Sequence, residues 1–80
     1  MQDLITALAR LLVSEPDAVR VTASELGRDT LLELTVAPED VGRIIGRQGR
    51  TIRSLRTVLA AASRDSERGC QLEVLDRDES

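Results

Sequence analysis

The stretch that most restricts the fold of this 80-residue chain is IIGRQGRTI, residues Ile44 to Ile52. One apolar run ends at Ile45 and the next begins at Ile52, and between them two glycines bracket two polar residues. The chain must therefore reverse tightly. Glycine permits the positive φ that such a turn usually needs, and it has no side chain to keep another backbone away. A gap with backbone walls suits a long, thin, charged ligand such as a phosphodiester backbone.

The distribution of charge favours the same kind of ligand. The chain is acidic overall, with a formal net charge of −3, yet residues 41–64 hold six arginines and no acid. Residues 1–40 carry −5 and residues 65–80 carry −4. A solvated helix face would normally pair Glu with Arg at i,i+4 spacing, and this block does not. The position of the arginines therefore favours a nucleic-acid partner, although the net charge alone argues against one.

The composition excludes several kinds of site. Aromatic residues are absent, so no base can stack on Phe, Tyr or Trp as on an RNA-recognition sheet. Cys70 is the only cysteine and there is no histidine, which excludes an intrachain disulfide and a zinc cluster. Calcium-loop spacing is also missing. Without His, Tyr or Lys as general base or nucleophile, we expect no enzyme activity, metal, cofactor or small-molecule substrate.

The N-terminal apolar stretch does not have the character of a targeting segment. Asp3 lies near its start and Arg10 interrupts it, so it is neither a signal peptide nor long enough to span a bilayer. We therefore expect a cytoplasmic protein without a membrane partner.

Hydrophobic periodicity predicts six elements in the order α-β-β-α-α-β. A helix is expected from Gln2 or Asp3 to Val13, strands over 19–24 and 31–36, a short helix from Pro38 to Ile45, a longer helix over 50–63 and a strand over 70–74. The first helix has an apolar stripe of five residues: Leu4, Ile5, Leu8, Leu11 and Leu12. The long helix has a second stripe: Ile52, Leu55, Val58, Leu59 and Ala62. Its arginines at 50, 53 and 64 lie opposite, with Arg56 at the border.

The connections between these elements predict the topology. The first two strands are joined by a short turn and should form an antiparallel hairpin, whereas the third follows a two-helix crossover and should lie parallel to its neighbour. The expected fold is a two-layer α+β domain with a three-stranded mixed sheet and three helices on one face. One domain should occupy residues 1–75, and residues 76–80 should form an acidic, disordered tail.

Together these features resemble a known family. The apolar pair, the Gly-x-x-Gly and the Ile after two further residues match the signature of KH domains, and the element order resembles the type II arrangement. The preceding segment, residues Thr35 to Arg43, is similar to the small bacterial single-KH-domain proteins of the KhpA type. The resemblance covers roughly residues 1–75.

The resemblance implies that the chain binds single-stranded RNA, as an RNA chaperone or post-transcriptional regulator. It also implies pairing with itself or with a larger KH-containing partner. KH domains hold the backbone of about four nucleotides in the glycine loop, which corresponds here to Gly46, Arg47, Gln48 and Gly49. The family also forms an apolar groove next to this loop, and the resemblance places four residues of this chain at its floor: Val41, Gly42, Ile45 and Ile52. We expect the loop together with Arg43, Arg50 and Arg53 to neutralise three or four phosphates. The family often has Lys where Arg47 stands, and Arg keeps the charge and adds a bidentate fork.

Other interpretations of the glycine motif fit less well, and one stays open. A helix-turn-helix unit would need a longer first helix and no β-hairpin. A Walker loop needs Lys after its last Gly, and a dinucleotide fingerprint needs Gly at position 44. The open alternative is an assembly subunit whose basic helix docks on an acidic partner protein. The RNA targets, the choice between RNA and single-stranded DNA and the dimer interface are not fixed by the sequence.

Overall fold

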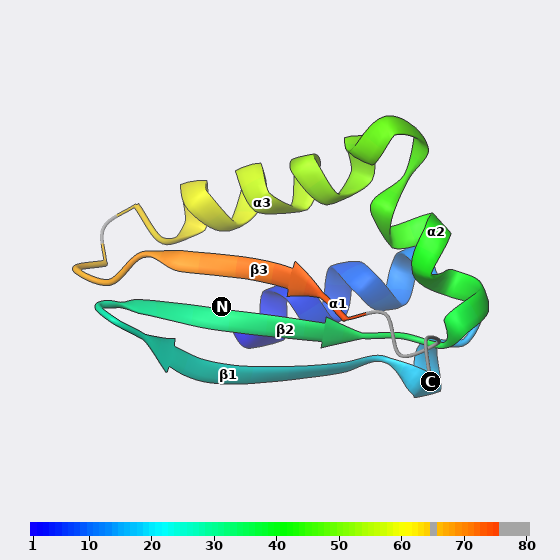
Figure 1. The fold of residues 1–80 in the computed structure, drawn as a ribbon, viewed down its shortest axis with the longest axis horizontal. Coiled ribbons are helices and arrows are strands. Elements are labelled where there is room, and N and C mark those ends of the chain that lie inside the picture. The colour runs from blue at the N-terminus through cyan, green and yellow to red at the C-terminus, as the bar shows by residue number, and fades with distance from the viewer. Residues whose placement is uncertain (65, 76–80) are drawn as a thin grey trace.

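The computed structural model describes residues 1–64 and 66–75 (Figure 1). Its main elements are α1 (Gln2–Leu12), β1 (Arg20–Leu26), β2 (Asp29–Thr35), α2 (Val41–Ile45), α3 (Arg50–Ala62) and β3 (Cys70–Val74). Three short 3₁₀ turns lie between them: η1 (Pro16–Ala18), η2 (Pro38–Asp40) and η3 (Arg47–Gly49). The expected order α-β-β-α-α-β is confirmed. The acidic tail predicted for residues 76–80 lies outside the described residues.

The three strands form one mixed sheet in the order β1-β2-β3. β1 and β2 form an antiparallel hairpin in which Arg20 pairs with Thr35, and Gly27 adopts a φ of 63° in the turn. β2 and β3 run parallel, with Thr30 opposite Cys70. Both pairings confirm the predicted topology, and β3 is left with one unpaired edge because it is an outer strand.

The helices cover one face of this sheet, as predicted. α1 crosses behind the strands and α3 runs beside β3 (Figure 1). A single buried cluster joins the helices to the inner face of the sheet: Ile5, Ala9, Val19, Leu32, Leu34, Val36, Ile44, Ile52, Leu55, Leu59 and Leu72. Cys70 is a free thiol, half-buried against this cluster. The core therefore consists almost entirely of Leu, Ile and Val.

The apolar stripes predicted for α1 and α3 are only partly buried, so the prediction of one continuous core-facing stripe on each helix is corrected. Leu11 is 81% exposed, Leu12 39% and Val58 41%. α1 packs on the sheet through Ile5 and Ala9, so Leu11 is turned away from the strands. Ala62, at the end of α3, is also exposed. Leu11, Leu12 and Val58 line an apolar surface between α1 and α3.

The first strand is also less buried than its alternating pattern predicted. Val21 is half-buried but Ala23 is exposed. Ala23 lines an open hollow with Met1 and Gln2 at the first turn of α1, so no side chain covers it. Within residues 1–64 and 66–75, no helix is long and apolar enough to cross a membrane.

Candidate nucleic-acid interface

The glycine loop is a tight turn between α2 and α3. α2 ends where the Gly46 amide donates to the Gly42 carbonyl (2.8 Å), and the Gly49 amide then donates to the Gly46 carbonyl (3.1 Å). Three of the four loop residues have positive φ: Gly46 at 78°, Gln48 at 57° and Gly49 at 75°. This conformation brings the start of α3 directly against the end of α2, and it depends on glycine at the two outer positions.

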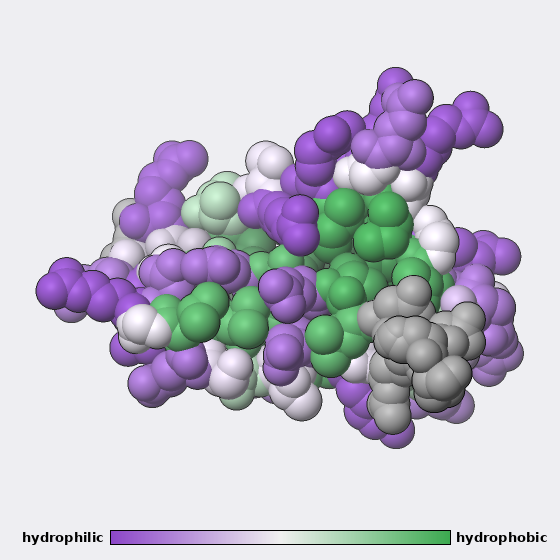
Figure 2. Space-filling model, viewed as in Figure 1, coloured by the Kyte–Doolittle hydropathy of each residue, from purple (hydrophilic) through white to green (hydrophobic). Residues whose placement is uncertain are grey.

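The side chains of the loop and of the exposed face of α3 form a basic surface. Arg47, Gln48, Arg50 and Arg53 are all exposed. In the part of the chain that the structure describes, none of these arginines has an acidic side chain within salt-bridge distance. Figure 2 shows hydrophilic side chains projecting from this end of the molecule above a hydrophobic area. A polyanion would therefore meet unpaired cations here.

An open hollow of about 470 Å³ adjoins the loop. Its lining combines α2, α3 and β3: Ile45, Ile52, Arg56, Glu73 and Val74. Ile45 is half-buried and Ile52 is 6% exposed, so each packs on the core and presents only part of its surface. Arginine side chains on one side and an apolar floor beside them suit a strand whose phosphates lie at the loop and whose bases turn inward.

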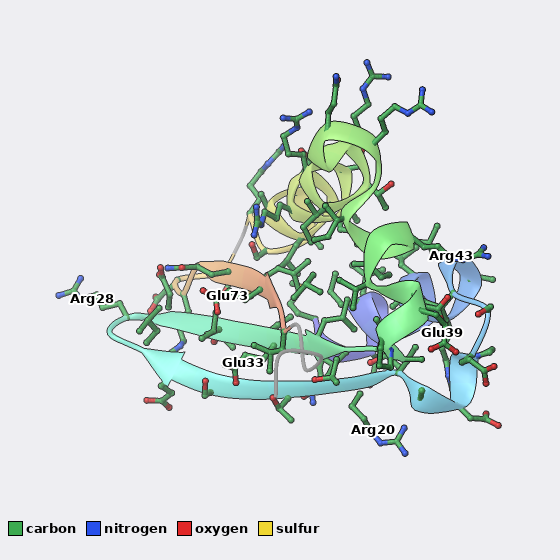
Figure 3. The ribbon with its side chains drawn as sticks, turned by 45° about the vertical axis from the view of Figure 1, so that its right-hand side comes forward. Arg20, Arg28, Glu33, Glu39, Arg43 and Glu73 are labelled. Carbon is green, nitrogen blue, oxygen red and sulfur yellow. The ribbon has the colours of Figure 1, made fainter. Side chains whose placement is uncertain are left out.

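The structure brings most of the predicted site residues together but sets three apart. Val41, Gly42 and Arg43 lie in the first turn of α2, before the loop, and they do not line this hollow, although the Gly42 carbonyl accepts a hydrogen bond from the Gly46 amide. Figure 3 shows Arg43 and Glu39 on the same side of the molecule. The Arg43 Nε atom lies 3.4 Å from Asp40 Oδ1, so its charge is partly neutralised. A role for these three in RNA binding stays a prediction.

Asp40 is a buried carboxylate that the sequence analysis did not single out. It accepts hydrogen bonds from the Ser14 amide (2.9 Å), the Ser14 hydroxyl (2.9 Å) and the Glu15 amide (3.1 Å). The pKa of Asp40 is lowered from 3.8, chiefly by the Ser14 amide and against the opposing effect of burial. The remaining donors and Arg43 lower this pKa further. Asp40 therefore ties the connection after α1 to the start of α2.

The sequence analysis also did not predict that the residues of α3 and β3 opposite Ile45 would line this hollow. Arg56 and Val74 line the hollow beside Ile52. One signal was available, because Arg56 follows Ile52 by four residues and so lies on the same side of a helix. No local signal in the sequence predicted that Val74 of β3 would lie next to Ile45 and Ile52.

Comparisons with known proteins agree with this arrangement. Residues 2–74 match the family model described as "KhpA/KhpB, KH domain". RNA-binding protein KhpA of Halalkalibacterium halodurans is 41% identical over 76 residues, covering 95% of this chain and 100% of that protein. The protein of that name from Treponema pallidum is 44% identical over 75 residues, covering 94% of each chain. Its counterpart in Streptomyces coelicolor is 38% identical over 78 residues, covering 98% and 95%. No solved structure matches significantly.

Proposed function

The chain belongs to the KhpA/KhpB KH-domain family, and on that premise we propose that it binds single-stranded RNA through the loop from Gly46 to Gly49. The observation that carries this proposal is the combination of unpaired exposed arginines with an adjoining apolar hollow. The relatives that the chain resembles over nearly its whole length are named RNA-binding proteins.

In this proposal the loop holds the sugar–phosphate backbone. Its tight turn lets a strand approach the main chain closely, and Arg47 provides a charged fork for a phosphate. Ile45 and Ile52 offer apolar contact to the bases in place of aromatic stacking. A single groove of this kind supplies little contact area, so the affinity for a short strand should be about micromolar.

The cellular role follows from the family resemblance. We expect the protein to act in the cytoplasm as an RNA chaperone or post-transcriptional regulator and not as an enzyme. Weak, backbone-directed binding suits such a role, because the protein must act on many strands and release them.

We also propose that the protein works as a dimer or with another KH-domain protein. A hollow between α1 and α3 is lined mainly by apolar side chains, including Leu11, Leu12 and Val58. The α3 residues that line this hollow include Thr51, Ser54 and Val58. The hollow beside the glycine loop, where the RNA is proposed to bind, is lined by Ile52 and Arg56 of the same helix. The two surfaces flank the helix on different sides, so pairing would leave the groove open. Two linked grooves would raise avidity by about 10² to 10⁴.

A salt titration of the purified protein with mixed single-stranded RNA tests the proposal. Because Arg43 is paired with Asp40, the arginines expected to contact phosphates reduce to three that form no salt bridge within residues 1–64 and 66–75: Arg47, Arg50 and Arg53. Each neutralised phosphate contributes about −0.7 to the slope of log K against log salt, so we expect a slope of about −2. Absence of RNA binding, or a slope near zero, would favour the alternative of an assembly subunit that docks an acidic partner.

A further inference from the structure

The unpaired edge of β3 offers backbone groups to the groove. The Thr30 amide donates to the Gly69 carbonyl and the Leu75 amide to the Leu34 carbonyl, so the odd-numbered residues of this segment turn toward β2. Backbone groups alternate along a strand, which leaves those of Cys70, Leu72 and Val74 on the free edge. These groups face the side on which α3 runs (Figure 1).

Arg56 of α3 covers one of these groups. Its Nε and Nη2 atoms each lie 3.1 Å from the Leu72 carbonyl oxygen. A guanidinium has five N–H donors in a rigid plane, so this contact fixes the plane and leaves the outer edge, formed by Nη1 and Nη2, free. Among the residues that the structure describes, Arg56 makes no salt bridge, and its side chain is exposed.

The position of Arg56 places that outer edge in the path of a bound strand. It lines the hollow beside the loop together with Ile45 and Ile52. It also lines the next hollow along α3, of about 300 Å³, together with Leu59 and Cys70. A strand held at the glycine loop and extending along α3 would therefore pass over Arg56.

We propose that Arg56 reads a guanine in this groove, an inference that rests on the RNA binding proposed above. The parallel donors of an arginine edge match the O6 and N7 acceptors of guanine, whereas adenine presents an amino donor beside its N7. Since Arg56 also covers the Leu72 carbonyl, that oxygen is not free to accept from the amino group of adenine or cytosine. Arg56 thus favours guanine over adenine.

Three oligouridylates of about ten nucleotides, each with one central purine, would test this selection. The purine is guanosine, adenosine or 7-deazaguanosine, which lacks the N7 acceptor. Because a bidentate contact discriminates by roughly tenfold, the protein should bind the guanosine strand about tenfold more tightly than the adenosine strand. The 7-deazaguanosine strand should lose most of that advantage, and this comparison needs no variant.

Two variants assign the preference to Arg56. Arg56→Lys keeps the charge but not the fork, so it should bind the adenosine strand within about twofold of the parent and lose the preference for guanosine. Arg53→Lys makes the same change on the exposed face of the same helix and is the matched control. This variant should keep the preference for the guanosine strand over the adenosine strand. Equal binding of all three strands by the parent, or a guanosine preference retained in Arg56→Lys, would overturn the assignment while leaving RNA binding intact. Failure to bind any strand would remove the proposed function and this inference with it.

Discussion

The two glycines of the loop satisfy different requirements. Gly46 has φ 78° and ψ 170°, a region that essentially only glycine occupies. A Cβ at this position would lie 2.7 Å from the Thr51 amide nitrogen, which is too close for any side chain. Gly49 has φ 75° and ψ 17° in the left-handed region, and a Cβ there would meet only Ile52 Cγ2 at 3.9 Å. A side chain at Gly46 would therefore cause both steric crowding and backbone strain, whereas a side chain at Gly49 would cause backbone strain alone.

The two alanine variants should consequently differ in stability. Gly49→Ala should lower the free energy of unfolding by about 1–2 kcal/mol, the cost of the left-handed conformation. Gly46→Ala should cost about 3 kcal/mol or more, because the crowding against Thr51 adds to the strain. Urea denaturation of both proteins would measure this. Equal losses would contradict the loop geometry.

A charge reversal in the loop tests its contact with phosphate. Replacing Arg47 and Gln48 together by Asp should weaken binding to single-stranded RNA at least about tenfold, because two negative charges would face the phosphates. Both side chains are exposed, so the variant should lose less than about 1 kcal/mol of stability.

Arg28→Asp is the control for overall charge in that experiment. Arg28 lies at the turn of the hairpin, at the far end of the molecule from α2 (Figure 3), and its reversal should reduce RNA affinity much less. A folded double variant with the affinity of the parent, measured by fluorescence anisotropy, would show that the loop does not hold the RNA backbone.

At the scale of elements, the placement of α2 depends on a contact between segments far apart in the sequence. Asp40 ends η2 and accepts three hydrogen bonds from Ser14 and Glu15, which follow α1. Its neighbour Arg43 adds an ion pair. Because α2 leads directly into the glycine loop, this contact also fixes where the loop stands relative to α1.

The lowered pKa of Asp40 makes this contact sensitive to acid. The unfolded chain takes up a proton at Asp40 near pH 3.8, before the folded protein does, so the stabilisation is present above that pH. It is lost as the pH falls through the lower folded-state pKa. Asp40→Asn should therefore lower the urea midpoint at pH 7, and the difference from the parent should shrink below about pH 4.

Glu39→Gln provides the matched control for this variant. Glu39 is the exposed neighbour of Asp40 in the same turn, and removing its charge should leave the acid sensitivity of the protein in place. A difference between parent and Asp40→Asn that stays constant from pH 7 to pH 3 would show that the carboxylate is not the source of the stabilisation.

At the scale of the whole molecule, the apolar surface between α1 and α3 makes the proposed self-association testable. Leu11→Asp and Val58→Asp should each shift a dimer toward monomer, because each places a charge on an exposed apolar surface and disturbs no core residue. Light scattering at tens of micromolar would measure this. The dimer should also bind a long RNA strand more tightly than either variant does.

The outer face of the sheet is the alternative surface. Leu31 alternates along β2 with the buried Leu32 and Leu34 and so lies on the opposite face of the sheet, where it is half-buried and outside the core cluster. If Leu31→Asp disrupts the dimer and the two helix variants do not, the interface lies on the sheet and not between the helices. A parent protein that is strictly monomeric with and without RNA would exclude self-association.

The sequence by itself determined the elements and their order. The period of the apolar residues and the turn residues such as Pro38 and Gly27 are local signals, and they predicted the hairpin and both helices around the glycine loop. The parallel placement of β3 also followed, because a two-helix crossover can return to the sheet in few ways. The loop could be recognised because its chemistry lies in nine consecutive residues.

Only the tertiary structure decided which side chains meet across elements. Leu11 and Ile5 belong to the same helical stripe, yet Leu11 is exposed and Ile5 is buried, because the rotation of α1 on the sheet is set by packing. Arg43 was expected to contact phosphate and Arg56 was placed only at the border of the basic face, but Arg43 pairs with Asp40 and Arg56 with a carbonyl of β3. These contacts depend on distances between segments far apart in the chain, and neither helical period nor local charge contains that information.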